Sequence, residues 1–257
     1  MQDVVPGIAG EVRIAYWPKE RPNDKVFSPW IQVSSNHDFT HQFQLTDLKA
    51  NTTYQLETQC QLDSVLGQTI FGNFTTAPDM SSSASITFTV VTGQGFHRRD
   101  DPDNGHRIYP VMQELDPDFF IHTGDIIYYD KLAPVALTTD LARLKWNRMY
   151  ALPFQRDFHN HIASYFIKDD HDTWLNDCWP TKQSKRMGDF TFKQGQQIFL
   201  EQVPMGTETY RTIRWGKDLQ IWLVEGRDFR SPNSMLDGPE KTIWGHQQKT
   251  WFKQTVR

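Results

Sequence analysis

This chain has few cysteines, no net positive charge and no long apolar run. The 257 residues include 2 cysteines, Cys60 and Cys178, which cannot make a disulfide framework or a thiolate zinc site, and we interpret both as buried thiols. The formal net charge of -4 argues against a nucleic-acid-binding surface, because such surfaces are basic. The longest apolar runs are strand-sized, as in residues 221–224, so the sequence predicts no membrane-spanning helix.

The composition does provide enough apolar surface for a packed core. Apolar residues make up 38% of the chain, and 257 residues suffice for one large domain or two smaller ones. Residues 1–10 contain neither a basic nor an apolar leader segment, so they predict no signal peptide. The sequence stops inside a helix predicted from Gly245 onward, and we therefore expect it to be a fragment.

The first third of the chain predicts a partial β-sandwich over residues 1–76. Apolar and polar residues alternate over 39–45 and again over 54–60, as they do in strands with one buried face. Residues 77–85 are rich in serine and contain a proline, and they predict a domain linker. The acidic excess belongs to the part before this boundary, since residues 1–85 contain 5 Lys and Arg against 9 Asp and Glu.

A tyrosine corner supplies a resemblance for this first part. The segment from Leu45 to Tyr54, followed by residues 74–78, resembles the end of a fibronectin type III domain. In such sandwiches the tyrosine hydroxyl hydrogen-bonds back to the preceding turn, and we expect this of Tyr54. A complete domain of this kind has ~100 residues and seven strands, so the resemblance implies that the first strand or two are missing.

Residues 86–257 change to alternating strands and helices. The predicted strands are 86–91, 118–122, 163–167 and 219–224. The predicted helices are 106–115, 140–152 and 190–202. Thr139 is the expected cap of the second helix and Pro153 its expected end. Such alternation indicates a layered α/β domain.

Ionisable residues follow each predicted strand, and in layered α/β folds ligands bind at these carboxyl ends. Asp125 follows Gly124, which allows a tight turn and a close backbone approach. The Asp125 carboxylate can ligate a hard cation or bridge two, or it can be a solvated turn residue. Tyr128 is ambiguous, because it also fits a packing aromatic residue with its hydroxyl at the rim.

The loop after the third predicted strand gives a sharper signal. Asp169, Asp170 and Asp172 surround His171. Buried carboxylates without partners would repel one another, so we favour a metal cation here over a surface turn. The neighbouring acids favour the charged form of His171, which suits a general acid or a residue that stabilises phosphoryl charge.

Two arginines follow the last predicted strand. Arg227 and Arg230 offer guanidinium groups that suit bidentate recognition of phosphate or sulfate. An ion-pair network with the neighbouring acids explains them equally well, and the sequence does not decide between the two interpretations.

The order of these motifs resembles the PhoD-like alkaline phosphatases, a family of binuclear metallophosphoesterases. The motifs are Gly-Asp-x-x-Tyr at 124–128, Asp-Asp-His-Asp at 169–172, and Arg227 after a strand. The resemblance implies a four-layer α/β/β/α catalytic domain over residues 86–257, incomplete at its C-terminal end. The preceding sandwich also fits the arrangement of that family.

The resemblance also implies roles for the candidate residues. Asp125 would bridge two metal ions, Tyr128 would ligate iron, and Asp170 would take the metal-ligand position of a later motif. His171 would be the catalytic histidine, and the loop of Arg227 would face the phosphate. The implied cofactors are iron and calcium, with manganese or zinc as alternatives.

Two features depart from the family pattern. An iron-binding cysteine usually stands where this chain has Gly93, so a water, His97 or Asp100 would have to substitute. The family also uses later histidine ligands, whereas His246 is the one histidine after His171. Truncation explains their absence best, and we expect little or no activity from residues 1–257 alone.

The sequence thus predicts a secreted or periplasmic metal-dependent phosphoesterase that hydrolyses small phosphate esters with a metal-activated water. We expect a monomer that binds no nucleic acid. Two alternatives stay open. One is a non-catalytic binding protein with a degenerate metallophosphatase domain, and the other is a related sulfate-ester hydrolase.

Overall fold

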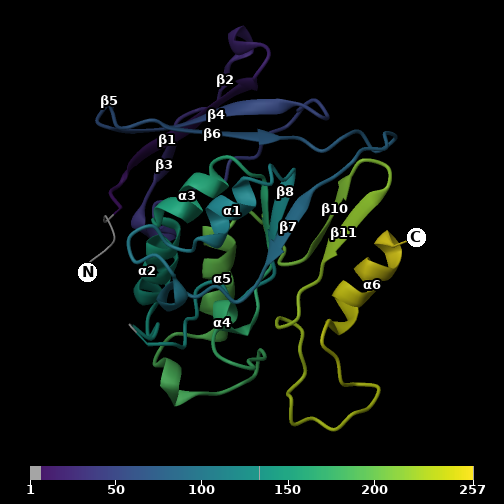
Figure 1. The fold of residues 1–257 in the computed structure, drawn as a ribbon. Helices are drawn as coiled ribbons and strands as arrows, with labels where there is room; N and C mark the ends of the chain where they lie inside the picture. Colours follow the sequence, from purple (N-terminus) through teal and green to yellow (C-terminus); the bar gives the residue numbers. More distant parts are fainter. Residues whose placement is uncertain (1–6, 133, 257) are drawn as a thin grey trace.

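Mixed sheets and helices make up the fold, as the sequence predicts. The computed structural model describes residues 7–132 and 134–256 (Figure 1). The first part is one antiparallel six-stranded sheet. Its strands are β1 (Gly10–Pro18), β2 (Val26–Phe27), β3 (Ile31–Val33), β4 (Thr53–Leu62), β5 (Val65–Leu66) and β6 (Ile70–Thr75). β1 pairs with β2, β3 and β4, and β4 also pairs with β5 and β6.

The second part alternates strands and helices around a parallel sheet in the order β7-β8-β9. An antiparallel hairpin, β10-β11, lies apart from that sheet. The strands are β7 (Phe88–Val91), β8 (Phe119–His122), β9 (Ser164–Phe166), β10 (Arg211–Trp215) and β11 (Leu219–Leu223). The helices are α1 (Ile108–Gln113), α2 (Thr139–Tyr150), α3 (Pro153–His159), α4 (Asp170–Thr173), α5 (Phe192–Gln202) and α6 (Gly245–Thr255).

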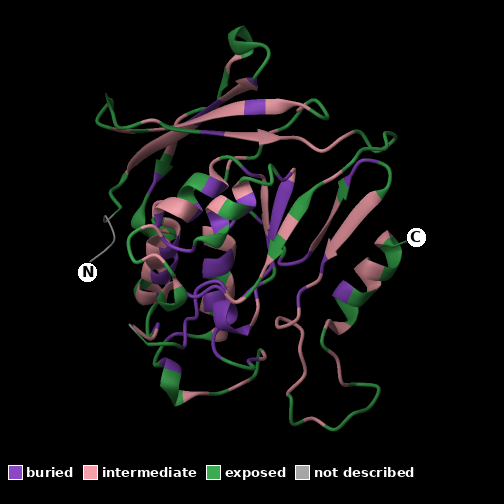
Figure 2. Ribbon diagram, viewed as in Figure 1, coloured by how far each residue is buried: buried purple, intermediate pink, exposed green. Residues whose placement is uncertain are grey.

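Alternation along β8 sends side chains to two different cores, because successive residues of a strand face opposite sides of a sheet. Phe120 packs with the residues of α1, α2, α3 and α5 in one buried cluster. Phe119 and Ile121 pack on the other side with Trp215 and Leu223 of the hairpin. Figure 2 shows buried residues along β8 and around α4. The site described below lies where this sheet meets α4.

Helix α6 covers the hairpin on the side opposite the β7–β9 sheet. The Trp222 ring lies 5.9 Å from Phe252, and its indole Nε1 donates to Thr255 Oγ1 at 3.0 Å. This confirms the helix predicted from Gly245. The complete four-layer α/β/β/α domain stays a prediction, as do the β-sandwich and the domain boundaries.

The predicted helix ends need correction. Thr138, not Thr139, caps α2, because its hydroxyl accepts from the Leu141 backbone N–H. Pro153 follows α2 but also begins α3, since the fixed φ of proline suits the first helical turn. The strand β10 was not predicted, and it pairs with the predicted strand at 219–224.

The strand predicted over residues 39–45 is wrong. The structure describes this segment in full and gives it no strand. Its polar side chains bind the second part of the molecule instead. Gln42 Nε2 donates to the carbonyls of Leu200 and Val203, and the nearby Asp38 Oδ2 accepts from Asn147 and Gln202. These contacts hold the segment against α2 and α5 without a β ladder.

Other details of the first part can be compared with the predictions. The Tyr54 hydroxyl accepts from the Lys49 backbone N–H at 2.9 Å, which confirms the predicted bond to the turn. Cys178 is buried, but Cys60 is exposed, so the prediction of a buried thiol is wrong for Cys60, which lies beside the β4–β5 turn. Among the residues described, no helix combines the length and apolar character needed to cross a membrane.

Candidate metal and catalytic site

Three loops meet at the carboxyl ends of β7, β8 and β9. The backbone N–H groups of Gly93, Gln94 and Gly95 donate to the carbonyls of 124, 125 and 126, at 2.9 to 3.1 Å. On the other side, the Tyr129 N–H donates to the His171 carbonyl at 3.0 Å. The predicted convergence of these strand ends is therefore present.

Glycine at position 124 is required by the way the loops approach. Gly124 has φ +104°, and a Cβ there would lie 2.6 Å from the Asp169 backbone nitrogen. Asp125 follows in the left-handed region with φ 59°, which Asp adopts more readily than most residues. The close approach predicted at this glycine is thus to the Asp169 backbone, and it turns Asp125 toward the loop after β9.

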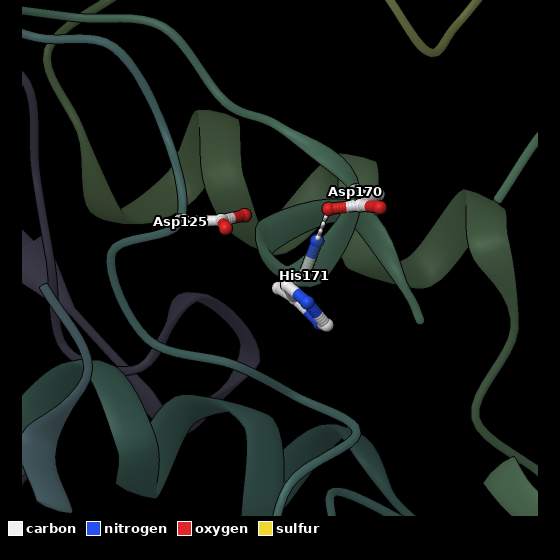
Figure 3. A group of neighbouring side chains, drawn as sticks. All are labelled: Asp125, Asp170 and His171. Carbon is white, nitrogen blue, oxygen red and sulfur yellow. Dashed lines mark hydrogen bonds between the residues drawn. The ribbon is translucent and has the colours of Figure 1, made fainter. Parts of the chain in front are cut away.

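Asp125, Asp170 and His171 form what we call the site cluster. One ligand atom from each lies within 4.8 Å of the others, and Figure 3 shows the Asp125 carboxylate pointing toward the other two side chains. Asp170 and His171 are buried, at 5% and 6% exposure. Asp125 comes from the loop after β8, and the other two residues come from α4, more than 40 positions later, so the fold brings together what the motifs only suggest.

The Asp125 carboxylate lacks enough partners for its charge. Oδ2 accepts from the Tyr128 hydroxyl at 3.1 Å, whereas the buried Oδ1 has no hydrogen-bond partner in the described part of the chain. Burial, together with the charges of Asp170 and Asp169, raises the pKa of Asp125, although His171 opposes the shift. Such a carboxylate gains most from a cation.

Tyr128 lies over the site cluster. Its ring stacks on His171 with centroids 4.4 Å apart, and burial and the Asp125 charge raise its pKa to about 12. The phenol therefore keeps its proton at neutral pH and donates it to Asp125. Both the packing role and the ligand role considered for Tyr128 are compatible with this position.

Asp130 orients His171, and this residue was missed by the sequence interpretation. Asp130 Oδ1 lies 2.6 Å from His171 Nδ1. Burial lowers the pKa of His171, but the hydrogen bond and charge of Asp130 outweigh it, so the net direction is upward. The imidazole is thus held by Nδ1, which leaves Nε2 as its second hydrogen-bonding atom.

The remaining acids of the Asp-Asp-His-Asp motif have partners of their own. Asp169 Oδ1 accepts from Arg227 Nε at 2.6 Å. Asp172 is fully buried, and its Oδ1 accepts from the backbone N–H groups of Ile126 and Ile127. Burial nevertheless raises the pKa of Asp172 to about 7. These two acids position the loops, and Asp170 is the acid of the motif that joins Asp125 in the site cluster.

The two predicted arginines differ in place. Arg227 pairs with Asp169 and lies 3.5 Å from Asp170 Oδ2, so the ion-pair interpretation describes it in this structure. Its Nη1 is buried and has no hydrogen-bond partner among the described residues. Arg230 Nε donates to Asn233 on its own loop instead of pairing with an acid of the site.

A second charged cluster, the ion-pair cluster, lies behind the site and was also missed. It consists of Lys168, Glu225 and Asp228. Lys168 Nζ donates to Glu225 at 2.7 Å and to Asp228 at 2.5 Å, and their side chains are almost completely buried. Lys168 stands directly before the Asp-Asp-His-Asp motif, and this position could have drawn attention to it. Its partners could not be found in the same way, because they come from the loop after β11.

The substitutes considered for the cysteine position can now be placed. Gly93 has φ +70°, and a Cβ there would meet no atom within 4 Å in the described chain. Asp100 Oδ1 accepts from the Arg107 N–H, so it is committed elsewhere. The His97 ring faces Tyr128 edge-on at 6.0 Å but does not join the site cluster.

Comparison with known proteins agrees with this geometry. Residues 88–257 match the description PhoD-like phosphatase. The chain belongs to the PhoD-like phosphatase family. This confirms the family predicted from the motifs, while the fibronectin likeness and the truncation stay predictions. None of the curated proteins matches the chain.

Solved structures show how this PhoD-like chain relates to known folds. A structure of PhoD superposes with a TM-score of 0.78 at 17% identity, covering 98% of this chain and 54% of that one. A purple acid phosphatase, PPD1 from yellow lupin (Lupinus luteus) seeds, gives 0.59 at 13% identity, covering 98% and 44%. The chain therefore shares its fold with both and spans about half of their length.

The residues of this PhoD-like site fit a cation. The buried, unpartnered oxygen of Asp125 faces Asp170 and His171, and oxygen and imidazole donors suit several divalent metals. The family and the site cluster thus support a metal cofactor, and the identity of the metal stays a prediction.

Proposed function

We propose that the chain carries the metal-binding part of a phosphoesterase that hydrolyses small phosphate esters. The observation that carries the proposal is the Asp125 carboxylate, which is deficient in partners and points at Asp170 and His171. Membership of the PhoD-like phosphatase family supports the same reaction class.

Each residue of the site has a separate part in this proposal. Asp125 and Asp170 hold the metal, and Tyr128 lies next to Asp125 as a further ligand. A bound divalent ion lowers the pKa of a coordinated water toward neutrality and so supplies the nucleophile. Iron and calcium are the ions expected from the family resemblance, with manganese or zinc as alternatives.

His171 and Arg227 act on the phosphate itself. Asp130 fixes His171 through Nδ1 and favours its protonated form, so Nε2 can donate to a phosphoryl oxygen or to the leaving alkoxide. Arg227 is held by Asp169, and its Nη1, which makes no hydrogen bond among the described residues and lies 3.8 Å from Asp177 Oδ1, can donate to a non-bridging oxygen. Arg230 would approach substrate only after leaving Asn233.

Hydrolysis of p-nitrophenyl phosphate and of bis(p-nitrophenyl) phosphate tests the proposal. The whole protein is assayed with manganese, zinc, calcium or iron, next to Asp125→Asn and the exposed control Asp237→Asn. We expect turnover in the wild type and the control and a loss of at least about 100-fold in Asp125→Asn, because ligands matter more than the residues behind them. Full activity in Asp125→Asn would sink the proposal.

Gly93 favours a second candidate, a binding protein with a degenerate site. This position supplies no side-chain ligand atom, and the space beside it is open in the described structure. Metal analysis separates the two candidates, because a degenerate site predicts a protein that binds none of the four metals. Sulfate esters assayed beside the phosphate esters test the third possibility, a sulfatase.

The setting of the enzyme is also proposed from the family resemblance. We infer a secreted or periplasmic monomer with a sandwich before the linker at 77–85 and a four-layer catalytic domain after it. The hydrogen bonds of Asp38 and Gln42 with α2 and α5, and the 2.8 Å bond from the Asn73 N–H of β6 to the Asn160 carbonyl after α3, support a fixed orientation of the two parts.

A further inference from the structure

Five buried or nearly buried groups beneath the site form a chain of hydrogen bonds that the proposed reaction does not use. We propose that this chain, which runs from Gly124 through His122, Gln94 and His106 to Gly95, positions the loops after β7 and β8 as one unit and thereby sets the geometry of Asp125. This inference rests on the proposed function, because it concerns the same metal site.

The direction of the chain is fixed at its first end. The Gly124 backbone N–H can only donate, and it lies 3.2 Å from His122 Nδ1. Nδ1 must therefore be the acceptor, which places the single proton of a neutral imidazole on Nε2. His122 is fully buried, and burial lowers its pKa to about 3, so the ring is neutral.

Gln94 is the central link. Its Oε1 lies 3.0 Å from His122 Nε2 and 2.8 Å from the Tyr109 hydroxyl, and it accepts from both. Its Nε2 then points to His106 Nδ1 at 3.4 Å. The amide orientation required by His122 is thus the same one that presents an N–H to His106.

The far end of the chain fixes His106 independently. The Gly95 carbonyl can only accept, and it lies 3.2 Å from His106 Nε2, which therefore carries the proton. His106 Nδ1 is then the acceptor, and its single lone pair is shared between Gln155 Nε2 at 2.5 Å and Gln94 Nε2 at 3.4 Å. The Gln94 amide has Met149 Sδ as a second neighbour at 3.2 Å. Because burial lowers the pKa of His106, the neutral tautomer persists.

The donor and acceptor roles deduced from the Gly124 end are the same as those deduced from the Gly95 end. The hydrogen-bond chain therefore has one consistent direction. Its terminal residues are the neighbours of functional positions, because Asp125 follows Gly124 and the open position Gly93 lies two residues before Gly95. Networks behind metal ligands typically change metal affinity by about 10–100-fold when broken. This network gives three buried polar side chains a role in a place that apolar packing could fill.

Paired variants of one histidine separate local from collective effects. In His122→Asn the side-chain oxygen replaces Nδ1 and keeps the bond from Gly124, but the donor to Gln94 is lost. In His122→Gln the amide replaces Nε2 and keeps the bond to Gln94, but the acceptor for Gly124 is lost. We expect each variant to weaken manganese binding by about 10-fold in calorimetric titration of the metal-free protein.

His106→Asn breaks the chain at Gly95 without touching the Asp125 loop. We expect a similar loss of about 10-fold, and no further loss when it is combined with His122→Asn, because a chain already broken at one link has little left to lose. Independent local effects would instead multiply to about 100-fold. Tyr165→Phe, which removes the half-buried hydroxyl that accepts from Trp215 Nε1 outside the site, is the matched control and should bind like wild type.

The outcomes separate this inference from the proposed function. A wild-type protein that binds no manganese contradicts the proposed function itself. If the wild type binds manganese and His122→Asn or His106→Asn binds it equally well, the proposal that the hydrogen-bond chain positions Asp125 is overturned. If a histidine variant loses its native circular dichroism, Tyr109→Phe tests the same hub, and unchanged affinity in that variant also counts against the chain.

Discussion

The site cluster and the ion-pair cluster are made of the same kinds of residue at neighbouring strand ends, yet their charges are balanced differently. In the ion-pair cluster Glu225 accepts from Lys168 and from the N–H groups of Arg227 and Asp228, so both its oxygens have partners. In the site cluster the Asp125 Oδ1 has none within the described residues. Glu225, saturated with partners, holds the fold together, whereas the unsaturated Asp125 marks the place for a cation.

The largest expected effect on stability comes from a change in the ion-pair cluster, whose acids all have partners. Lys168→Met removes the cation between two buried carboxylates, and we expect a loss of about 3–5 kcal/mol in unfolding free energy, measured by urea denaturation. Lys182→Met, at a half-buried lysine that binds two carbonyls, is the control and should cost less than about 1 kcal/mol. Equal, small losses in both variants would show that the ion-pair cluster is not structural.

The next largest effect is the stabilisation that a metal ion gives when it binds the site cluster. Manganese at about 100 times its Kd should stabilise the protein by about 2.7 kcal/mol, because it binds only the folded state, and thermal unfolding with and without the metal measures this. Removal of the metal with a chelator should reverse the gain. Asp125→Asn should show no gain, while Asp237→Asn should behave like the wild type, and any reversal of that order speaks against the site cluster.

A smaller effect tests whether each bond of the ion-pair cluster matters. Thr209 Oγ1 donates to Asp228 Oδ2 at 2.6 Å, and Thr209 is 5% exposed. Thr209→Val keeps the shape but leaves a buried carboxylate oxygen unpaired, so we expect a loss of about 1.5 kcal/mol in urea denaturation. Thr207→Val, at an exposed threonine nearby in sequence, should be neutral.

The smallest effect has the opposite sign. In the metal-free protein, Asp125→Asn removes a charge that repels Asp170 and Asp169, so stability should stay equal or rise by up to about 1 kcal/mol, limited by solvent screening of the half-buried group. Chemical denaturation in the presence of a chelator measures it. A clear loss of stability would place Asp125 among the structural acids, next to Glu225.

The sequence predicts the loops of the site better than the partners within them. Motif order and the alternation of strands and helices led to Asp125, Asp170 and His171, because local patterns determine where strands end. The structure brings their ligand atoms within 4.8 Å of one another, and their roles stay predictions. Which oxygen remains unpaired depends on contacts between distant loops. Asp130 reaches His171 across 41 positions, and nothing in the local pattern distinguishes it from a solvated acid.

The same reasoning explains the errors in the first part of the chain. The period of two over 39–45 predicts a strand only if a partner strand is available, and here Gln42 binds the Leu200 carbonyl of α5 while the adjacent Asp38 binds Asn147 of α2. Arg230 shows the same limit, since two arginines in one loop look equivalent in sequence. The fold commits Arg227 to the acids of the site and Arg230 to Asn233.

Calorimetric titration of the metal-free protein with manganese tests the central claim most directly. Wild type, Asp125→Asn and Glu225→Gln are compared under the same conditions. We predict saturable binding in the wild type, binding of similar affinity in folded Glu225→Gln, and a loss of more than about 100-fold in Asp125→Asn. Equal affinity in wild type and Asp125→Asn would contradict the claim that the unsaturated carboxylate is where the metal binds.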